Sequence, residues 1–254
     1  MKIIFFIFIC FIILNIKNTR NFKILDSTTN HKKILIITLE TRNLDYLDLH
    51  NESVQKYCDM HGYTYLFQTD YKNDLELPIY WKKIQIVLDH LPYYDYVVWL
   101  DSDSMITKYS TPLESVIDLN KSILISTDFH NIFNSLVTFI RKTYCTGVFI
   151  IKNNDVGKQF LNDCIHTYIN NPKCKTTTYN LNGTWAGECY EQGVVNQLLK
   201  TSYKQHVYEL PFYVVMNTYF YTTDAIILHK YGKKDVYDKF NDIKSGKEFH
   251  LFYL

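Results

Sequence analysis

Short apolar runs alternate with longer amphipathic segments along most of the chain. Runs rich in β-branched residues predict buried strands, because such side chains pack well on a pleated surface and a strand needs few residues. We predict strands at Lys33–Leu39, which is the clearest buried run, and at Tyr63–Phe67, Tyr96–Leu100, Ser122–Ser126 and Tyr144–Ile151. A further apolar run at Ile226–Leu228 predicts a strand near the C-terminus.

Helical periodicity fills the intervals between these strands. Asn43–His61 has apolar residues at helical spacing and precedes Gly62, a residue suited to ending a helix, while Ile79–His90 stops before Pro92. Two later helices show apolar faces at Val156, Phe160, Leu161, Cys164, Ile165 and Tyr168, and at Val194, Val195, Leu198 and Leu199. This alternation predicts an α/β fold, a Rossmann-like α/β/α sandwich with a mostly parallel sheet that binds ligands beyond the carboxyl ends of its strands.

The first 31 residues differ from the rest of the chain. The run Ile3–Ile16 is apolar except for Asn15, and it is shorter than the roughly 20 residues of a comfortable membrane span. We therefore predict that residues 1–16 are a signal peptide or a short signal anchor, residues 17–31 a polar stem, and residues 32–254 the folded domain. Basic residues in the stem argue against lumenal delivery, because positively charged residues beside an apolar segment prefer the cytoplasmic side. We nevertheless predict that the folded domain is delivered to the lumen.

Composition narrows the classes of function. The formal net charge is only +1, so the chain lacks the excess of basic residues that is typical of nucleic-acid-binding proteins. Sequons at Asn51 and Asn182 fit a glycoprotein of the ER or Golgi lumen, including a type II membrane protein. The six cysteines lack the spacing of a zinc site. Cys174 and Cys189 flank a polar stretch that a disulfide could close in an oxidising lumen, but spacing alone leaves the connectivity open.

The strongest chemical signal is a pair of carboxylates, Asp101 and Asp103, directly after the buried run Tyr96–Leu100. Alternate side chains of an extended chain share a face, so the two carboxylates can point together. Their repulsion favours a divalent cation between them, and oxygen ligands suit Mg²⁺ or Mn²⁺. A solvated surface turn is the competing interpretation, which the apolar strand immediately before the pair disfavours.

The region Tyr94–Asp103 resembles the D-x-D region of glycosyltransferase family 34, which contains galactosyl-, mannosyl- and xylosyltransferases. Other segments resemble further parts of that family in the same order: Asn51–Tyr63, Tyr80–Ile84 with its W-x-K, Cys145–Phe149 with its T-G-x-F, and the pair Glu191-Gln192. The resemblance covers most of residues 34–232. It implies a GT-A fold and a retaining, metal-dependent transfer of a hexose or pentose from a UDP- or GDP-sugar to a glycan or glycoprotein.

The resemblance also implies a ligand set for the cation, usually Mn²⁺. Asp101 and Asp103 would bind it, with Asp101 also near the ribose or phosphates of the donor. The third ligand would be His229, which lies in an H-x-x-G context after an apolar run. A histidine satisfied at a strand end is the alternative interpretation of His229 on its own.

Further residues are predicted to bind the donor or to act at the sugar. Lys83 matches the lysine of the W-x-K segment and would contact the donor sugar or phosphate, whereas Trp81 is expected in the core. The remaining donor-binding candidates are Thr38, Ser102, Asp128, Lys230 and Lys233. The catalytic candidates are Gln192, on the reacting face of the sugar, and Glu191, which could serve a covalent route to retention; same-face attack is the other route.

Two departures from the family pattern concern the donor sugar. Cys145 stands where the family has an asparagine, and Glu191 where an aspartate is more usual. Among rival functions, a sugar-phosphate nucleotidylyltransferase would need a glycine-rich loop after the first strand, but the chain has Glu40–Asn43 there. A glycogenin-like retaining transferase stays open, and donor screening would separate it from this family. A non-catalytic sugar-binding protein on the same scaffold is disfavoured by the intact Asp101, Asp103 and His229, which do not by themselves establish turnover.

Overall fold

The computed structural model describes residues 32–72, 75–127, 143–174, 186–218, 223–230 and 235–247. The predicted signal segment and stem lie outside these residues. Within them, no helix is both long enough and apolar enough to cross a membrane.

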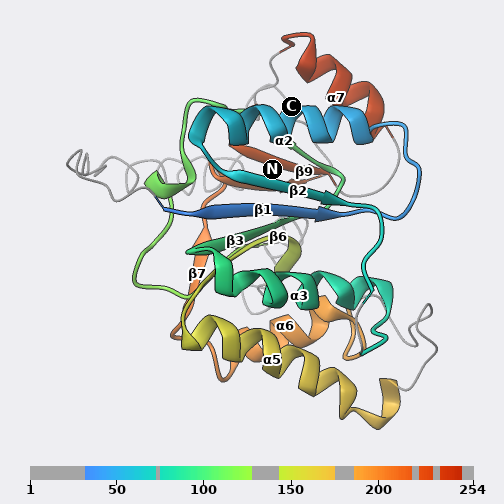
Figure 1. The fold of residues 1–254 in the computed structure, drawn as a ribbon, viewed down its shortest axis with the longest axis vertical. Coiled ribbons are helices and arrows are strands. Elements are labelled where there is room, and N and C mark those ends of the chain that lie inside the picture. The colour runs from blue at the N-terminus through green and yellow to red at the C-terminus, as the bar shows by residue number, and fades with distance from the viewer. Residues whose placement is uncertain are drawn as a thin grey trace, which may run out of the picture. The chain divides into compact units, whose positions relative to one another are not determined.

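Strands and helices alternate in the first half of the chain as the apolar pattern predicts (Figure 1). The elements are β1 (Ile34–Leu39), α2 (Leu47–His61), β2 (Thr64–Gln68), α3 (Ile79–His90) and β3 (Tyr96–Leu100). Gly62 ends α2 in the left-handed region at φ 70°, where the absence of a Cβ removes the steric penalty. Helix α2 begins at Leu47, four positions after the predicted start at Asn43, because the first residues form a turn.

The second half adds elements that the sequence pattern did not reveal. The expected ones are β5 (Ile123–Thr127), β6 (Tyr144–Lys152), α5 (Asp155–Ile169), α6 (Glu191–Lys200) and β9 (Ile227–Lys230). The unexpected ones are β4 (Ser104–Ile106), β7 (Val207–Leu210), β8 (Val215–Thr218) and α7 (Val236–Lys244). The three unexpected strands have only three or four residues each, too few to show a period.

The main sheet has six strands in the order β2-β1-β3-β6-β5-β7. Its neighbours β2, β1 and β3 run parallel, as do β5 and β7, while β6 is antiparallel to both strands beside it. The predicted α/β fold with a mostly parallel sheet is therefore confirmed, with β6 as the exception.

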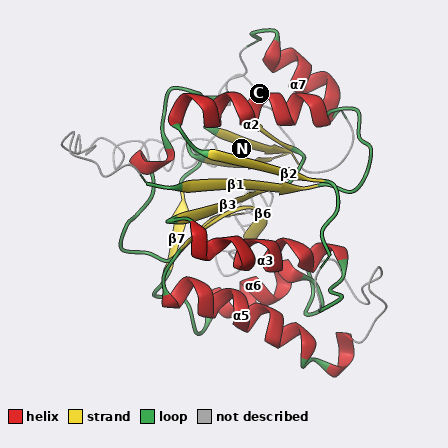
Figure 2. Cartoon of the chain, viewed as in Figure 1, coloured by secondary structure: helices red, strands yellow, loops and turns green. Residues whose placement is uncertain are grey.

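Helices cover both faces of this sheet (Figures 1 and 2). One face packs against α2, where Val54 and Tyr57 join a buried cluster with Ile36 and Val98. The other face packs against α3, α5 and α6, and Trp81 of α3 is fully buried there. Trp81 stacks on Tyr168 and donates from Nε1 to the carbonyl of Cys189 at 2.9 Å, so the expectation of a core role is confirmed.

A second, three-stranded sheet in the order β4-β9-β8 continues from the carboxyl end of β3. Strand β4 pairs antiparallel with β9, and Ser104 lies opposite His229 in the register. This pairing matters for function, since it brings a residue near the C-terminus beside the two aspartates that follow β3.

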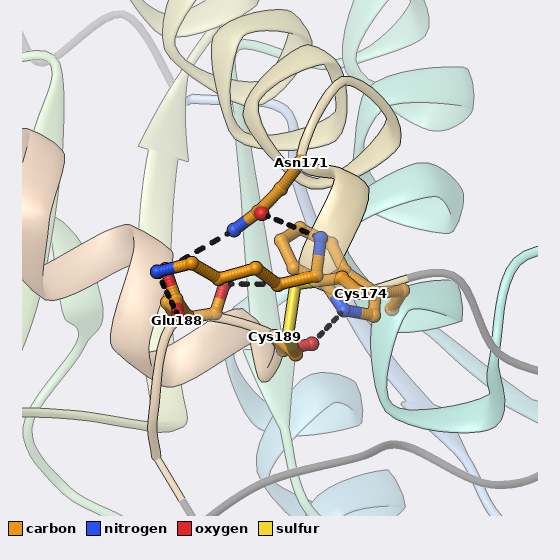
Figure 3. The surroundings of a disulfide bond; sticks show 6 residues. Asn171, Cys174, Glu188 and Cys189 are labelled. Atoms are coloured by element: carbon orange, nitrogen blue, oxygen red, sulfur yellow. Dashed lines mark hydrogen bonds and ion pairs between the residues drawn. A yellow bond between two sulfur atoms is a disulfide. The ribbon is translucent and has the colours of Figure 1, made fainter.

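A disulfide joins Cys174 to Cys189, which is the pairing that the sequence left open (Figure 3). Beside it, Glu188 accepts from Lys173 Nζ at 3.1 Å and from the Asn171 side-chain amide at 3.3 Å. The bridge holds the start of α6 against the end of α5, and so it supports the position of the α6 N-terminus, where Glu191 lies.

Candidate functional site

The site begins where β3 ends in a tight turn. The backbone N–H of Asp101 donates to the Gly147 carbonyl of β6 at 2.8 Å, and that of Ser104 donates to the Asp101 carbonyl at 3.1 Å. The Asp103 carbonyl accepts from the backbone N–H of Lys230 at 2.9 Å. Main-chain hydrogen bonds to neighbouring strands thus fix both aspartates. Their side chains stay partly exposed, that of Asp101 at 31% and that of Asp103 at 25%.

Asp101, Asp103 and His229 form one cluster, in which each offers a ligand atom and these atoms lie within 4.8 Å of one another. The Nε2 atom of His229 is 3.2 Å from Oδ1 of Asp103 and 4.0 Å from Oδ2 of Asp101. The three residues predicted as metal ligands are therefore brought together at the carboxyl edge of the main sheet.

The second oxygen of Asp101 has a different set of partners. Oδ1 accepts from Nζ of Lys83 at 2.8 Å and from the indole Nε1–H of Trp99 at 2.6 Å. Because both partners donate to Oδ1, the carboxylate is held with Oδ2 toward His229. Trp99 was not among the predicted site residues, although its place two residues before Asp101 puts both side chains on one face of the strand.

Lys83 is a buried cation between two carboxylates. Its Nζ lies 2.8 Å from Asp101 and 3.4 Å from Oε1 of Glu191, and its side chain is only 9% exposed. Burial disfavours the charged form, but the adjacent Asp101 and Glu191 outweigh this effect and raise the pKa of Lys83. Lys83 therefore stays charged and ties the start of α6 to the end of β3.

Glu191 and Gln192, the predicted catalytic pair, begin α6 beside Thr146 of β6. Glu191 is 1% exposed, and its Oε1 accepts from the Thr146 hydroxyl at 3.1 Å. Its other oxygen, Oε2, is buried without a hydrogen-bond partner among the described residues, and burial raises the pKa of this carboxyl. Gln192 is less buried, and its Oε1 accepts from the Thr146 N–H at 3.2 Å.

His229 fits into a space that exists because residue 147 has no side chain. A Cβ on Gly147 would lie 2.0 Å from Cε1 of the His229 ring, far inside any allowed contact. The Nδ1 atom of the ring lies 2.8 Å from Oδ1 of Asn217 and 3.7 Å from the Cys145 thiol. Burial lowers the pKa of His229, but the Asp103 carboxylate outweighs burial and raises the pKa well above its usual value.

We expect Gly147→Ala to displace the His229 ring and to lower both stability and cation affinity. Overpacking of this kind costs about 1–3 kcal/mol, because the new methyl group must push the ring aside. Denaturant unfolding and a Mn²⁺ titration of the purified chain would measure the two effects. The stability loss should disappear when Gly147→Ala is made in a His229→Ala background; an equal loss in both backgrounds would contradict the contact.

Near the same turn, a second cluster joins the end of β1 to Ser102. Glu40 is 6% exposed and accepts from Nε and Nη2 of Arg42, each at 2.7 Å, and from the Ser102 hydroxyl at 2.7 Å. Burial alone would raise the pKa of Glu40, but hydrogen bonds from Arg42 and Ser102 lower it on balance. Glu40 and Arg42 were missed as site residues; their position directly after a buried strand was the available signal.

The other donor-binding candidates have different surroundings. Thr38 is fully buried, and its hydroxyl lies 3.0 Å from Nε2 of His50, on the α2 face of the sheet and away from Lys83. Ser102 turns toward Glu40, as described above. Lys230 is 7% exposed, and burial lowers its pKa. Asp128 and Lys233 lie outside the described residues.

The chain matches a known protein family over most of its length. The model of the galactosyl transferase GMA12/MNN10 family matches residues 29–206. No curated protein matches the chain.

Solved structures share the fold at low sequence identity. A crystal structure of a glycosyltransferase involved in the glycosylation of the major capsid of PBCV-1 has a TM-score of 0.57 and 16% identity, over 84% of this chain and 99% of that one. The galactosyltransferase LgtC, in complex with donor and acceptor sugar analogs, has a TM-score of 0.51 and 10% identity, over 87% of this chain and 98% of that one. WbbM, a bifunctional enzyme, has a TM-score of 0.53 and 12% identity, over 88% of this chain and 51% of that one. The predicted GT-A fold is therefore confirmed.

Proposed function

Because the chain belongs to the galactosyl transferase GMA12/MNN10 family and is a glycosyltransferase, we propose that it transfers a hexose or pentose from a UDP- or GDP-sugar, with a divalent cation bound by Asp101, Asp103 and His229. The acceptor in this proposal is a glycan or glycoprotein. The observation that carries the proposal is the cluster of these three side chains at the carboxyl edge of the sheet, where α/β folds bind their ligands.

The three ligand atoms of this cluster have separations that fit a six-coordinate cation. Bonds of about 2.1 Å place neighbouring ligand atoms about 3 Å apart and opposite ones about 4.2 Å apart. The separations of His229 Nε2 from Asp103 and Asp101, 3.2 and 4.0 Å, lie in or near this range. Two carboxylates and one imidazole favour Mn²⁺ over Mg²⁺, since Mg²⁺ prefers oxygen ligands and retained water. A bound cation would neutralise the charge that develops on the departing nucleoside diphosphate.

Lys83 and Glu191 have a supporting role in this proposal. Lys83 aligns Asp101 through Oδ1, and Glu191 holds Lys83 from the α6 side. Glu191 is 1% exposed and is bound to both Lys83 and Thr146, so attack on a sugar would require it to leave these partners. The burial of Glu191 therefore favours same-face attack over the covalent route, with Gln192 as the side chain nearer the sugar.

We place the reaction in the lumen of the ER or Golgi. The apolar run at residues 3–16 supports this location. The Cys174–Cys189 disulfide supports it independently, because disulfides persist in oxidising compartments.

A donor panel tests the proposal. The purified chain is incubated with UDP- and GDP-linked hexoses and pentoses in the presence of Mn²⁺, and release of UDP or GDP is measured before and after addition of a chelator. We expect release from one or a few donors, stopped by the chelator and restored by excess Mn²⁺. Release that the chelator leaves unchanged would refute the role of the cation, and no release from any donor would count against the donor class.

The ligand role of His229 has its own test. We expect His229→Ala to raise the Mn²⁺ concentration needed for half-maximal nucleotide release by at least about tenfold, because the cation loses one of three protein ligands. His90→Ala is the matched control, since the ring of His90 bonds to the Ile86 carbonyl in the last turn of α3. An identical Mn²⁺ titration for wild type and His229→Ala would reject His229 as a ligand.

A further inference from the structure

Asn217 of β8 is the buried side chain that links the second sheet to the end of β5. It is 1% exposed, and its Nδ2 donates to the Ser126 hydroxyl at 2.5 Å and to the Thr127 carbonyl at 2.9 Å. A backbone carbonyl can only accept, so the amide nitrogen of Asn217 must face Thr127. Its Oδ1 is then the atom that faces His229, at 2.8 Å from Nδ1.

This orientation determines which nitrogen of His229 carries a fixed proton. An amide oxygen can only accept, so Nδ1 of His229 must be the donor in the bond to Asn217. A cation that replaces the other ring proton would therefore bind the lone pair of Nε2, the nitrogen that faces Asp103 at 3.2 Å. Without the acceptor at Asn217, the ring could carry its proton on Nε2 or rotate, and either change would remove the ligand atom from the cluster.

We infer that Asn217 is a positioning residue, which selects the Nδ1–H form of His229 and aims Nε2 at the cation site. The inference rests on the proposed function, because it assumes that His229 binds a cation. Removing the hydrogen-bond partner of a metal-binding histidine typically weakens the affinity for the metal by about 10- to 100-fold. Nothing in the sequence pattern singled out Asn217, since it lies in a four-residue strand far from the D-x-D segment in the chain.

The test compares Asn217→Leu with a matched substitution elsewhere. Asn154→Leu also removes a side chain that accepts from one N–H, that of Gly157, and donates to a serine hydroxyl, that of Ser122. Asn154 follows the carboxyl end of the antiparallel strand β6 and therefore lies at the opposite edge of the sheet from the candidate site. Both variants of the full chain are titrated with Mn²⁺, and pulsed EPR records the coupling of bound Mn²⁺ to the imidazole nitrogen.

We expect Asn217→Leu to weaken Mn²⁺ binding by about tenfold or more and to reduce the nitrogen coupling. Asn154→Leu should leave both measurements at wild-type values, even where the two variants lose similar thermal stability. A folded Asn217→Leu protein with wild-type affinity and wild-type coupling would overturn the inference.

A second pair of variants covers the case in which Asn217→Leu does not fold. Asn217→Asp keeps an oxygen that accepts from Nδ1–H, whereas Asn217→Ser is too short to reach the ring. We expect affinity to be retained by the aspartate and lost by the serine; equal affinities would overturn the inference. If the wild type itself binds Mn²⁺ without nitrogen coupling, the ligand role of His229 in the proposed function fails instead, so the two failures are distinguishable.

Discussion

Asp103→Asn is expected to lower the rate of sugar transfer by about a thousandfold or more while the protein stays folded. The substitution keeps the size of the side chain but removes the charge that would hold the cation beside His229, 3.2 Å away. A loss of several kcal/mol of charge stabilisation corresponds to a rate change of this order. The measurement is nucleotide release at saturating donor and Mn²⁺, together with a thermal unfolding curve for each protein.

The matched control is Asp95→Asn, at the other end of the same strand. Asp95 is exposed, and its Oδ2 accepts from the Lys33 N–H at 2.8 Å, a bond that an asparagine oxygen can also accept. We expect this variant to keep wild-type activity. Turnover at the wild-type rate in a folded Asp103→Asn protein would refute the assignment of Asp103.

The second large effect is expected on stability. Lys83→Met removes the cation between Asp101 and Glu191 and leaves the buried Glu191 carboxylate without its charged partner. Breaking a buried ion pair on one side typically costs about 3–5 kcal/mol. We expect a loss of this order in the free energy of unfolding at pH 7, measured by denaturant titration, together with loss of transfer, since Asp101 loses the donor that orients it.

The stability loss should depend on pH. Burial raises the pKa of the Glu191 carboxyl above its ordinary value of 4.5, and the nearby Lys83 charge opposes this rise. Without Lys83 the pKa should rise further, and a group whose pKa is raised on folding destabilises the fold once it ionises. The loss of unfolding free energy in Lys83→Met should therefore be largest above the raised pKa of Glu191. It should become smaller as the pH falls toward 4.5.

Lys82→Met provides the control for this experiment, since it makes the same change of charge one position earlier in α3. Nζ of Lys82 donates to the Tyr71 carbonyl at 2.7 Å, and it pairs with no carboxylate in the part of the chain that the structure describes. We expect a small, pH-independent change in this variant. An equal loss in both variants, or a loss in Lys83→Met that does not vary with pH, would contradict the buried pairing with Glu191.

The architecture could be predicted because it depends on local apolar pattern. All six predicted strands and both helices of the first half lie within a few residues of their observed positions, since most of them bury a continuous apolar face. The direction of β6 could not be predicted, because an apolar run has the same pattern in either direction. Strands β4, β7 and β8 were missed since short strands are stabilised by pairing with neighbours and leave no periodic signal.

The site was predictable only in part, for a similar reason. Asp101 and Asp103 follow a strand in the sequence, so their position at the sheet edge follows from local pattern, and His229 was found through the family resemblance. The partners of these residues come from distant segments: Asn217 contacts His229 from another strand, and Glu191 reaches Lys83 from α6. Thr38 stays a prediction as a donor-binding residue: its hydroxyl lies 3.0 Å from Nε2 of His50, on the face of the sheet that α2 covers.

The most direct test of the proposed cation site is a crystal of the protein grown with Mn²⁺ and UDP or GDP, with data collected at the manganese absorption edge. We expect an anomalous difference peak bonded to Asp101, Asp103 and Nε2 of His229, at about 2.1 Å from each ligand atom. A nucleotide bound in the site with no anomalous peak between these three side chains would contradict the assignment.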